Sequence, residues 1–257
     1  MVISNGITTE LGRTAFSIKP QGFIHAINPE WSQASVAAEA LHSFTPNTAL
    51  RLRYFGAPDQ LLGNTEVSRA EPEVFANERV TSHIGYIRLE QRLGNNWEFH
   101  FQGRVGKRLF NDPFARHNTT FWTIGPHIFW RVTEHLKLFG GYHYELGLAA
   151  GRYELEPEED RSYVHHFFAL GFDAELMPHL ELEVDFHYER TNFTTGILED
   201  ERNGGHENIF LGNGRLLYKL TNSTALTLSL QQGNRRQNFH LTHDHITNVG
   251  VGIIHRF

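Results

Sequence analysis

Alternating hydrophobic and polar residues run through most of the chain. The alternation is clearest over 180–193, where Leu182, Val184, Phe186 and Tyr188 are separated by charged residues and histidine. Successive side chains of a strand point to opposite faces, so a period of two predicts strands with one apolar and one polar face. The pattern predicts about twelve strands, at 13–27, 34–44, 49–55, 80–93, 97–110, 120–132, 136–148, 163–176, 180–193, 206–220, 224–232 and in the C-terminal segment.

The connections between these strands alternate in length. Turns of about three or four residues are expected near positions 46, 95, 134, 178 and 222, and longer polar loops near 30, 68, 114, 155, 200 and 238. This alternation indicates an up-and-down order with short turns at one end and long loops at the other. Residues 1–12 are polar and are expected to form a short tail. No linker or internal repeat divides the chain, so 1–257 is expected to be a single domain.

The C-terminal strand ends on an aromatic residue. Every second residue back from the terminus gives a largely apolar face, formed by Phe257, His255, Ile253, Val251 and Val249. Such a strand resembles the closing strand of bacterial outer-membrane β-barrels, the porin-like superfamily. The resemblance covers nearly the whole chain but names no specific family.

What the resemblance implies is an all-β fold, a transmembrane antiparallel up-and-down β-barrel of about twelve strands. It further implies contact with outer-membrane lipid and lipopolysaccharide, and recognition by the barrel-assembly machinery during biogenesis. Both termini would lie in the periplasm, and the long loops would lie outside the cell.

A soluble sandwich or a lipocalin-like barrel also alternates, with its apolar face in the core. Three features favour the membrane barrel. The predicted strands of about 10 to 14 residues cross a bilayer when tilted, the polar face carries glycine and many charges, and aromatic residues lie at strand ends on the apolar face, as interfacial girdles do. These aromatic residues are Trp97, Trp122, Trp130, Tyr144, Tyr188 and Tyr218.

Composition narrows the classes further. The net charge of −6 argues against a nucleic-acid partner, and the absence of cysteine removes disulfides and thiolate metal sites. No apolar run reaches the roughly 18 residues of a transmembrane helix. A mean hydropathy of −0.40 suits a barrel in which only alternate residues meet lipid. The first residues lack the basic and apolar regions of a signal peptide, so an exported protein would be represented by its mature form.

Charges on the polar face separate along the chain. The third to sixth strands contribute Arg51, Arg53, Arg88, Arg92, Arg104, Arg108 and Arg131. The seventh to ninth contribute Glu145, Asp173, Glu175, Glu181, Glu183, Asp185 and Glu189. In a closed barrel these residues would line the lumen as a basic wall opposite an acidic wall. The sequence therefore predicts a passive channel for small polar or charged solutes; the alternative is that the charges pair and fill the lumen of a closed structural or interaction barrel that acts through its loops.

Histidines also fall on the polar face, at His100, His127, His143, His165 and His187. Imidazoles near carboxylates can bind a transition metal or respond to pH. The alternative is a set of scattered polar residues at different heights, and no metal or cofactor is assigned. The segment 58–77 is expected to be irregular, and its apolar residues suit either a constriction folded into the lumen or an external loop packed on its neighbours.

An outer-membrane lipid hydrolase would need a serine within hydrogen-bond reach of a base. In Ser82–His83 and His42–Ser43 the side chains point to opposite faces, and the same holds for Ser162 and His165. No catalytic or nucleotide-binding motif is present. We therefore expect that the protein is not an enzyme.

Overall fold

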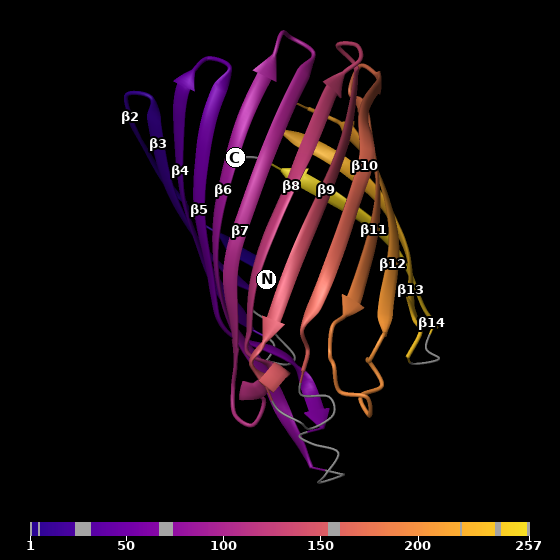
Figure 1. Ribbon diagram of the computed structural model, residues 1–257. Coiled ribbons are helices and arrows are strands. Elements are labelled where there is room, and N and C mark those ends of the chain that lie inside the picture. The colour runs from indigo at the N-terminus through magenta and orange to yellow at the C-terminus, as the bar shows by residue number, and fades with distance from the viewer. Residues whose placement is uncertain are drawn as a thin grey trace.

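The computed structural model describes residues 2–4, 6–23, 32–66, 74–153, 160–221, 223–239 and 243–255. Most of these residues belong to one antiparallel sheet (Figure 1). Its strands are β1 (Val2–Ser4), β2 (Ile7–Leu11), β3 (Thr14–Phe23), β4 (Gln33–Thr45), β5 (Thr48–Glu66), β6 (Phe75–Leu93), β7 (Trp97–Phe110), β8 (Thr119–Arg131), β9 (Leu136–Ala149), β10 (Tyr163–Met177), β11 (Leu180–Phe193), β12 (His206–Lys219), β13 (Thr224–Gln237) and β14 (His243–His255). Two 3-10 helices, η2 (Ala115–His117) and η3 (Ala150–Tyr153), lie in the connections.

Every strand from β3 to β13 pairs with the next strand in the chain. This order confirms the predicted antiparallel up-and-down class. β1 and β2 both pair with β3, so together they occupy one place and the sheet has thirteen places instead of twelve. The expected polar tail is therefore wrong in its described part. It pairs with β3 at Ile7↔Ile18 and Leu11↔Thr14, although its own sequence has little period-two signal.

Short turns and long connections lie at opposite ends of the sheet, as the sequence predicts (Figure 1). We call these the short-turn end and the long-loop end. Val2 pairs with Phe23 at the long-loop end, whereas His255 pairs with Thr224 at the short-turn end. The described chain therefore begins and finishes at opposite ends, unlike the expected placement of both termini on one side. The terminal Phe257 lies outside the described residues.

The two faces of the sheet have opposite character. Apolar side chains of the outer face are exposed, with Leu170 at 58%, Val105 at 59% and Phe101 at 53% of their full accessible surface. Polar side chains of the inner, concave face include Glu145 at 3% and Thr123 at 4%. A surface that is apolar outside and polar inside is the arrangement that a lipid environment requires of a barrel.

Aromatic residues gather at two levels of the outer face. Trp97 and Trp130 are directly opposite each other near the short-turn end, and their rings stack with centroids 5.1 Å apart. Trp122 and Tyr144 lie farther toward the long-loop end, with centroids 5.4 Å apart. These two levels match the aromatic girdles that flank the apolar band of membrane barrels.

The outer apolar band ends before the long-loop end of the strands. His83, Lys107 and Thr120 are neighbours on the outer face of β6, β7 and β8, and all three side chains are exposed. On these three strands the continuous apolar band ends at this row, and Leu109 and Phe75 lie beyond it as separate exposed apolar residues. Among the described residues, no helix is long and apolar enough to span a membrane.

Candidate channel interior

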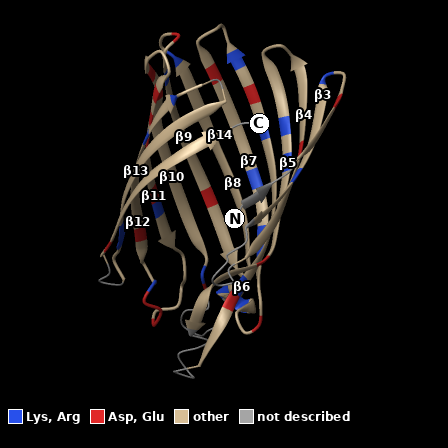
Figure 2. Cartoon of the chain, turned by 180° about the vertical axis from the view of Figure 1, so that it is seen from behind, with Lys and Arg blue, Asp and Glu red and all other residues tan. Residues whose placement is uncertain are grey.

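All fourteen charged residues predicted to line the lumen lie on one face of the sheet. The cross-strand pairs Arg51↔Arg88, Arg104↔Thr123 and Thr123↔Glu145 carry this face from β5 to β9. The pairs Glu145↔His165 and Asp173↔Glu183 extend it to β11. Figure 2 shows the charged positions distributed over these strands. Because facing follows from a period of two, sequence alone could assign it.

Arginines of the basic side are held by neighbours on adjacent strands. Arg51 donates to Glu90 on β6 over 2.8 Å and to Glu39 on β4 over 2.5 Å. Arg88 donates to the Gln102 side chain through both Nε and Nη2, at 3.1 and 2.8 Å. The Arg53 guanidinium lies over the Tyr86 ring, 5.6 Å from its centroid. Glu39 was not recognised from the sequence, because its strand face carries no run of charges.

Glu145 lies within the basic side instead of facing it. Arg104 Nη2 is 2.6 Å from Glu145 Oε2, and Thr123 donates to the same oxygen over 2.7 Å. Tyr163 donates to the other oxygen over 2.6 Å and accepts a hydrogen bond from Arg108 over 2.8 Å. This network joins four strands, β7 to β10, and satisfies a carboxylate that is almost fully buried.

Carboxylates of the acidic side are paired in the same lateral way. Glu183 binds Arg215 on the neighbouring β12, and Glu181 binds Lys219 on the same strand. Asp173 has a like charge, Glu183, directly opposite on β11, and the opposite charge Lys137 directly opposite on β9.

The expected separation into two facing walls is thus only partly present. Directly opposite side chains on adjacent strands are about 5 Å apart, so the charges are balanced by their neighbours along the sheet before they act across the interior.

The five histidines of the inner face do not form one cluster. His127 Nε2 and His143 Nε2 are 2.5 Å apart, and Gln102 approaches the same His143 nitrogen at 2.7 Å. His165 instead contacts Thr191, and His187 lies 3.2 Å from Asp185. His100 is directly opposite His127, and His127 contacts His143, so three of the five are neighbours and the expected scatter is only partly present.

Hollow spaces remain on the inner face. A cavity of about 420 Å³ near the short-turn end is lined by Asn47, Arg92, Glu98, Phe129, Arg131 and Lys137, among others. A neighbouring one of about 370 Å³ is lined by Arg131, Asp173, Glu175, Glu181 and Glu183, among others. A third hollow, of about 760 Å³, crosses β3 to β8 and is instead lined mainly by apolar residues of the outer face. The charged inner face therefore borders open volume at the short-turn end.

The long-loop end is packed instead. All buried apolar side chains of the described part of the chain belong to the inner face or to connections here, and we call them the mouth cluster: Ala57, Leu61, Val80, Phe114, Phe121 and Ala149. The segment 58–77, expected to be irregular, instead extends β5 and β6 in its described part. Irregular pairing between Ala57/Gln60 and Leu61/Gly63 bends this hairpin, which passes beneath the long-loop end in Figure 1.

A buried polar group anchors the bent hairpin to the loops beside it. Glu78 is 6% exposed, and its carboxylate lies 3.1 Å from His117 Nδ1 on η2 and 3.4 Å from Arg161 Nη1 before β10. Thr65 donates to it over 3.0 Å. Glu78 is five residues past the outer polar row at His83. Burial raises its pKa, but the hydrogen bond from His117 and the charge of Arg161 outweigh burial, and the pKa is lowered overall.

Known proteins resemble this chain in structure but not in sequence. No protein-family model and no curated protein matches the sequence. The outer membrane channel DcaP of Acinetobacter baumannii has a similar structure, with a TM-score of 0.64 and 10% identity over 100% of this chain and 84% of that chain. A bacterial polysaccharide outer membrane secretin gives a TM-score of 0.54 and 11% identity over 100% of this chain and 78% of that chain.

A third similar structure is the trimer form of OmpT, an outer membrane protein of Vibrio cholerae, with a TM-score of 0.50, 9% identity and 99% coverage of both chains. At such identities the likeness shows the fold alone. It confirms the fold that the alternating strands predict: the chain has the fold of these outer-membrane β-barrels.

Proposed function

We propose that this protein is an outer-membrane channel through which small polar or charged solutes diffuse passively. The observation that carries the proposal is the inner face, where six of the fourteen charged residues border hollow volume at the short-turn end while the outer face is apolar and exposed. These six are Arg92, Arg131, Asp173, Glu175, Glu181 and Glu183. A charged interior behind an apolar exterior is what a water-filled passage across a lipid bilayer needs.

The charge balance indicates which solutes would pass. Seven of the fourteen residues are arginines and seven are carboxylates, and most have an opposite charge or a polar partner on an adjacent strand. Lateral pairing weakens any net field across the interior. We therefore expect weak selectivity between anions and cations, and discrimination mainly by size.

The proposed function also implies a location and partners for the protein. It would lie in the bacterial outer membrane, with lipid and lipopolysaccharide around its apolar face, and would depend on the barrel-assembly machinery for insertion. An enzymatic role is not favoured, since the histidines of the three serine–histidine candidates have other partners. His83 contacts Tyr54 at 2.7 Å, His42 contacts Thr14 at 2.8 Å and His165 contacts Thr191 at 2.9 Å.

A closed barrel that acts through its loops is the second candidate. The mouth cluster favours it, because apolar side chains that are at most 6% exposed leave no room for water where they pack. The cluster involves β5 to β9 and their connections, so the proposal of a channel requires passage beside it, along β10 to β14.

Single-channel recording distinguishes the two candidates. The refolded protein is inserted into a planar bilayer, and the current is measured first in symmetric salt and then in a salt gradient. Discrete ohmic steps with a reversal potential near zero are expected. A protein that has demonstrably folded and inserted but passes no current would overturn the channel and leave the closed barrel.

A further inference from the structure

Three potential metal ligands converge on the inner face near the short-turn end. Glu90 lies on β6, directly opposite His100 on β7, and Glu98 precedes His100 by two residues on the same strand. Residues two apart on a strand share a face, and so do residues directly opposite across a ladder. The hairpin between β6 and β7 therefore brings all three side chains together.

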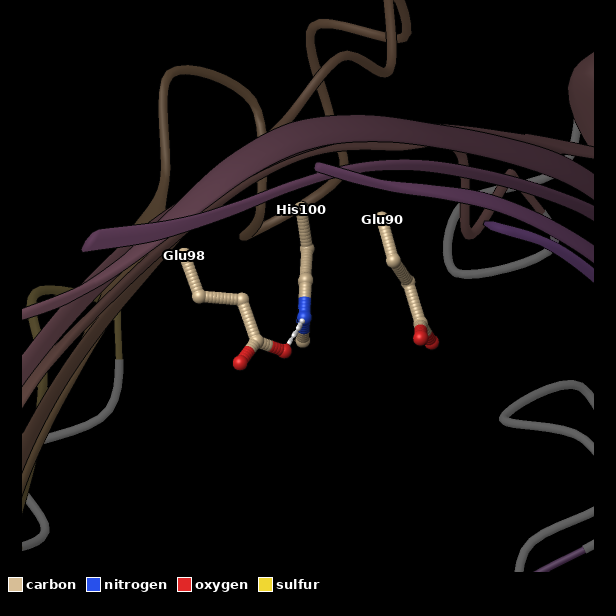
Figure 3. Close-up of side chains that lie close together, drawn as sticks. All are labelled: Glu90, Glu98 and His100. Carbon is tan, nitrogen blue, oxygen red and sulfur yellow. Dashed lines mark hydrogen bonds and ion pairs between the residues drawn. The ribbon is translucent and has the colours of Figure 1, made fainter. Parts of the chain in front are cut away.

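The ligand atoms of these residues are close enough for one ion. One atom from each lies within 4.8 Å of the other two, and His100 Nε2 is 2.5 Å from Glu98 Oε1. Figure 3 shows the two carboxylates on either side of the imidazole, with all three side chains pointing away from the strands into the interior. Two donor atoms on a tetrahedral Zn²⁺, each about 2.0 to 2.2 Å from it, are roughly 3.4 Å apart, so small side-chain rotations suffice.

The surroundings support the three side chains as a site. The His100 ring packs against Phe129 with centroids 4.8 Å apart, which fixes the imidazole. The side chains of His100, Glu90 and Glu98 retain 11%, 17% and 31% of their accessible surface, so they are sheltered but reachable from the interior. Glu98 also lines the cavity of about 420 Å³, which supplies an entry path and room for further ligands.

Two guanidinium groups compete with a metal ion for these carboxylates. Arg51 Nε is 2.8 Å from Glu90 Oε1, and Arg92 Nε is 3.6 Å from Glu98 Oε2. Each of these closest contacts involves one oxygen of its carboxylate. Arg51 also binds Glu39, and Arg131 and Lys137 line the same cavity as Glu98, so these cations balance the carboxylates and a metal ion has to displace the guanidinium contacts.

We infer that Glu90, Glu98 and His100 form a binding site for a divalent transition metal ion of the Zn²⁺ class. One imidazole nitrogen with two carboxylate oxygens is a donor set that suits such an ion better than Mg²⁺, which prefers oxygen ligands alone. On binding, the Nε2 proton that bridges His100 and Glu98 leaves to solvent, and the nitrogen lone pair and the carboxylate oxygens coordinate the metal. The site is independent of the proposed conduction.

Calorimetric titration with Zn²⁺ tests this site. The full-length, tag-free protein, folded in detergent, is compared with His100→Gln and Glu98→Gln. His165→Gln is the matched control, because His165 is also an inner-face histidine near a carboxylate, 3.9 Å from Glu189. One ion per chain is expected, with affinity at least tenfold weaker in the first two variants and unchanged in the control. Undiminished Zn²⁺ binding by His100→Gln, no binding by the wild type, or Mg²⁺ binding as tight as Zn²⁺ would overturn the site.

A measurement on the wild type keeps the test valid if a variant fails to fold. X-ray absorption of the Zn²⁺-loaded protein is expected to show nitrogen and oxygen ligands with a single imidazole. Two or more imidazoles would place the ion at His127 and His143 instead, and none would exclude His100. Either result would contradict the assignment whatever the variants do.

Discussion

Arg104 on β7 and Glu145 on β9 form an ion pair across the intervening strand β8, with 2.6 Å between Nη2 and Oε2. Thr123, directly between them on β8, donates to the same oxygen and accepts a hydrogen bond from Arg104 Nε. One carboxylate thus ties three strands together from the inside. A fourth strand joins through Tyr163, so the network fixes the lateral order of this part of the interior.

Replacing Glu145 by Gln should destabilise the folded barrel. The change removes the charge that balances Arg104 and Arg108 while keeping the side-chain size. Losing hydrogen bonds to a charged group costs about 1.5 to 3 kcal/mol, and the low end is expected because Arg104 retains 30% of its side-chain surface. The measurement is the urea midpoint of unfolding in detergent. Glu189→Gln, whose carboxylate lies 3.9 Å from the His165 imidazole, should change the midpoint little. Equal losses in both variants would argue against the network.

Arginine at Val184 should impair insertion into bilayers. Val184 is the middle outer-face residue of the run from Leu180 to Tyr188, and an arginine facing lipid at the midplane of a barrel costs about 2 to 4 kcal/mol. Glu183→Gln, one residue away on the inner face, should insert normally. Folding into vesicles, followed by the mobility shift of unheated protein on gels, measures both. Normal insertion of Val184→Arg with failure of Glu183→Gln would invert the assignment of the faces.

Phe114→Ala should loosen the mouth cluster and increase conductance. Phe114 is 1% exposed and belongs to the packed end, so its loss leaves a cavity and costs about 3 to 5 kcal/mol. The expected readout is a larger single-channel current than that of the wild type. Phe139→Ala, on the inner face near the short-turn end, serves as the control. An unchanged current for Phe114→Ala would show that the cluster does not limit conduction.

The anchor at Glu78 should weaken in acid. Its pKa is lower in the folded protein than its ordinary value. Its contribution to stability is therefore complete above the unfolded pKa of about 4.3 and is lost as pH falls through the lower folded value. The difference in urea midpoint between wild type and Glu78→Gln, measured from pH 7 to pH 3, should shrink toward zero below about pH 4. A difference that stays constant over this range would contradict the prediction.

The sequence predicts the long strands well for a physical reason. Each strand from β7 to β12 meets two different environments, so its residues must alternate, and the alternation is readable. Prediction of strands from alternation fails where a strand has solvent on both faces or where a bulge breaks the period of two. β2 lies at the sheet edge with all five side chains exposed, and the extension of β5 contains two irregularities that shift its register around Pro58.

The sequence predicts which residues lie on the inner face but not which of them are in contact. Alternation assigns Arg104, Thr123 and Glu145 to one side of the sheet, but their contact depends on the register that the hairpins set. Partners such as Tyr163 and Glu39 carry no pattern of their own. The expectation of two opposed walls is only partly met for the same reason, because a sequence shows which charges share a face but not which ones lie side by side.

Removing residues 2–11 should leave a protein that still folds. These residues are the only described partners on that edge of β3. β14 runs toward the short-turn end and β3 runs away from it, so the two are antiparallel and could pair once β1 and β2 are gone. The shortened protein should keep the slow-unfolding, heat-sensitive gel mobility of a closed barrel. Complete loss of that folded form would show that β1 and β2 belong to the sheet permanently.

Within the described part of the chain, the strand order leaves one edge of β14 without a partner, although a membrane barrel needs every backbone group paired. In the described residues β14 has a partner only in β13, and its other edge presents unpaired backbone groups. Hydrocarbon offers no hydrogen bonds, and each unsatisfied group there costs several kcal/mol. Stable insertion into lipid therefore depends on closing the sheet at the free edge of β14. The free edge of β14 must pair with β2 in parallel or with β3 in antiparallel orientation before the protein can lie stably in a bilayer.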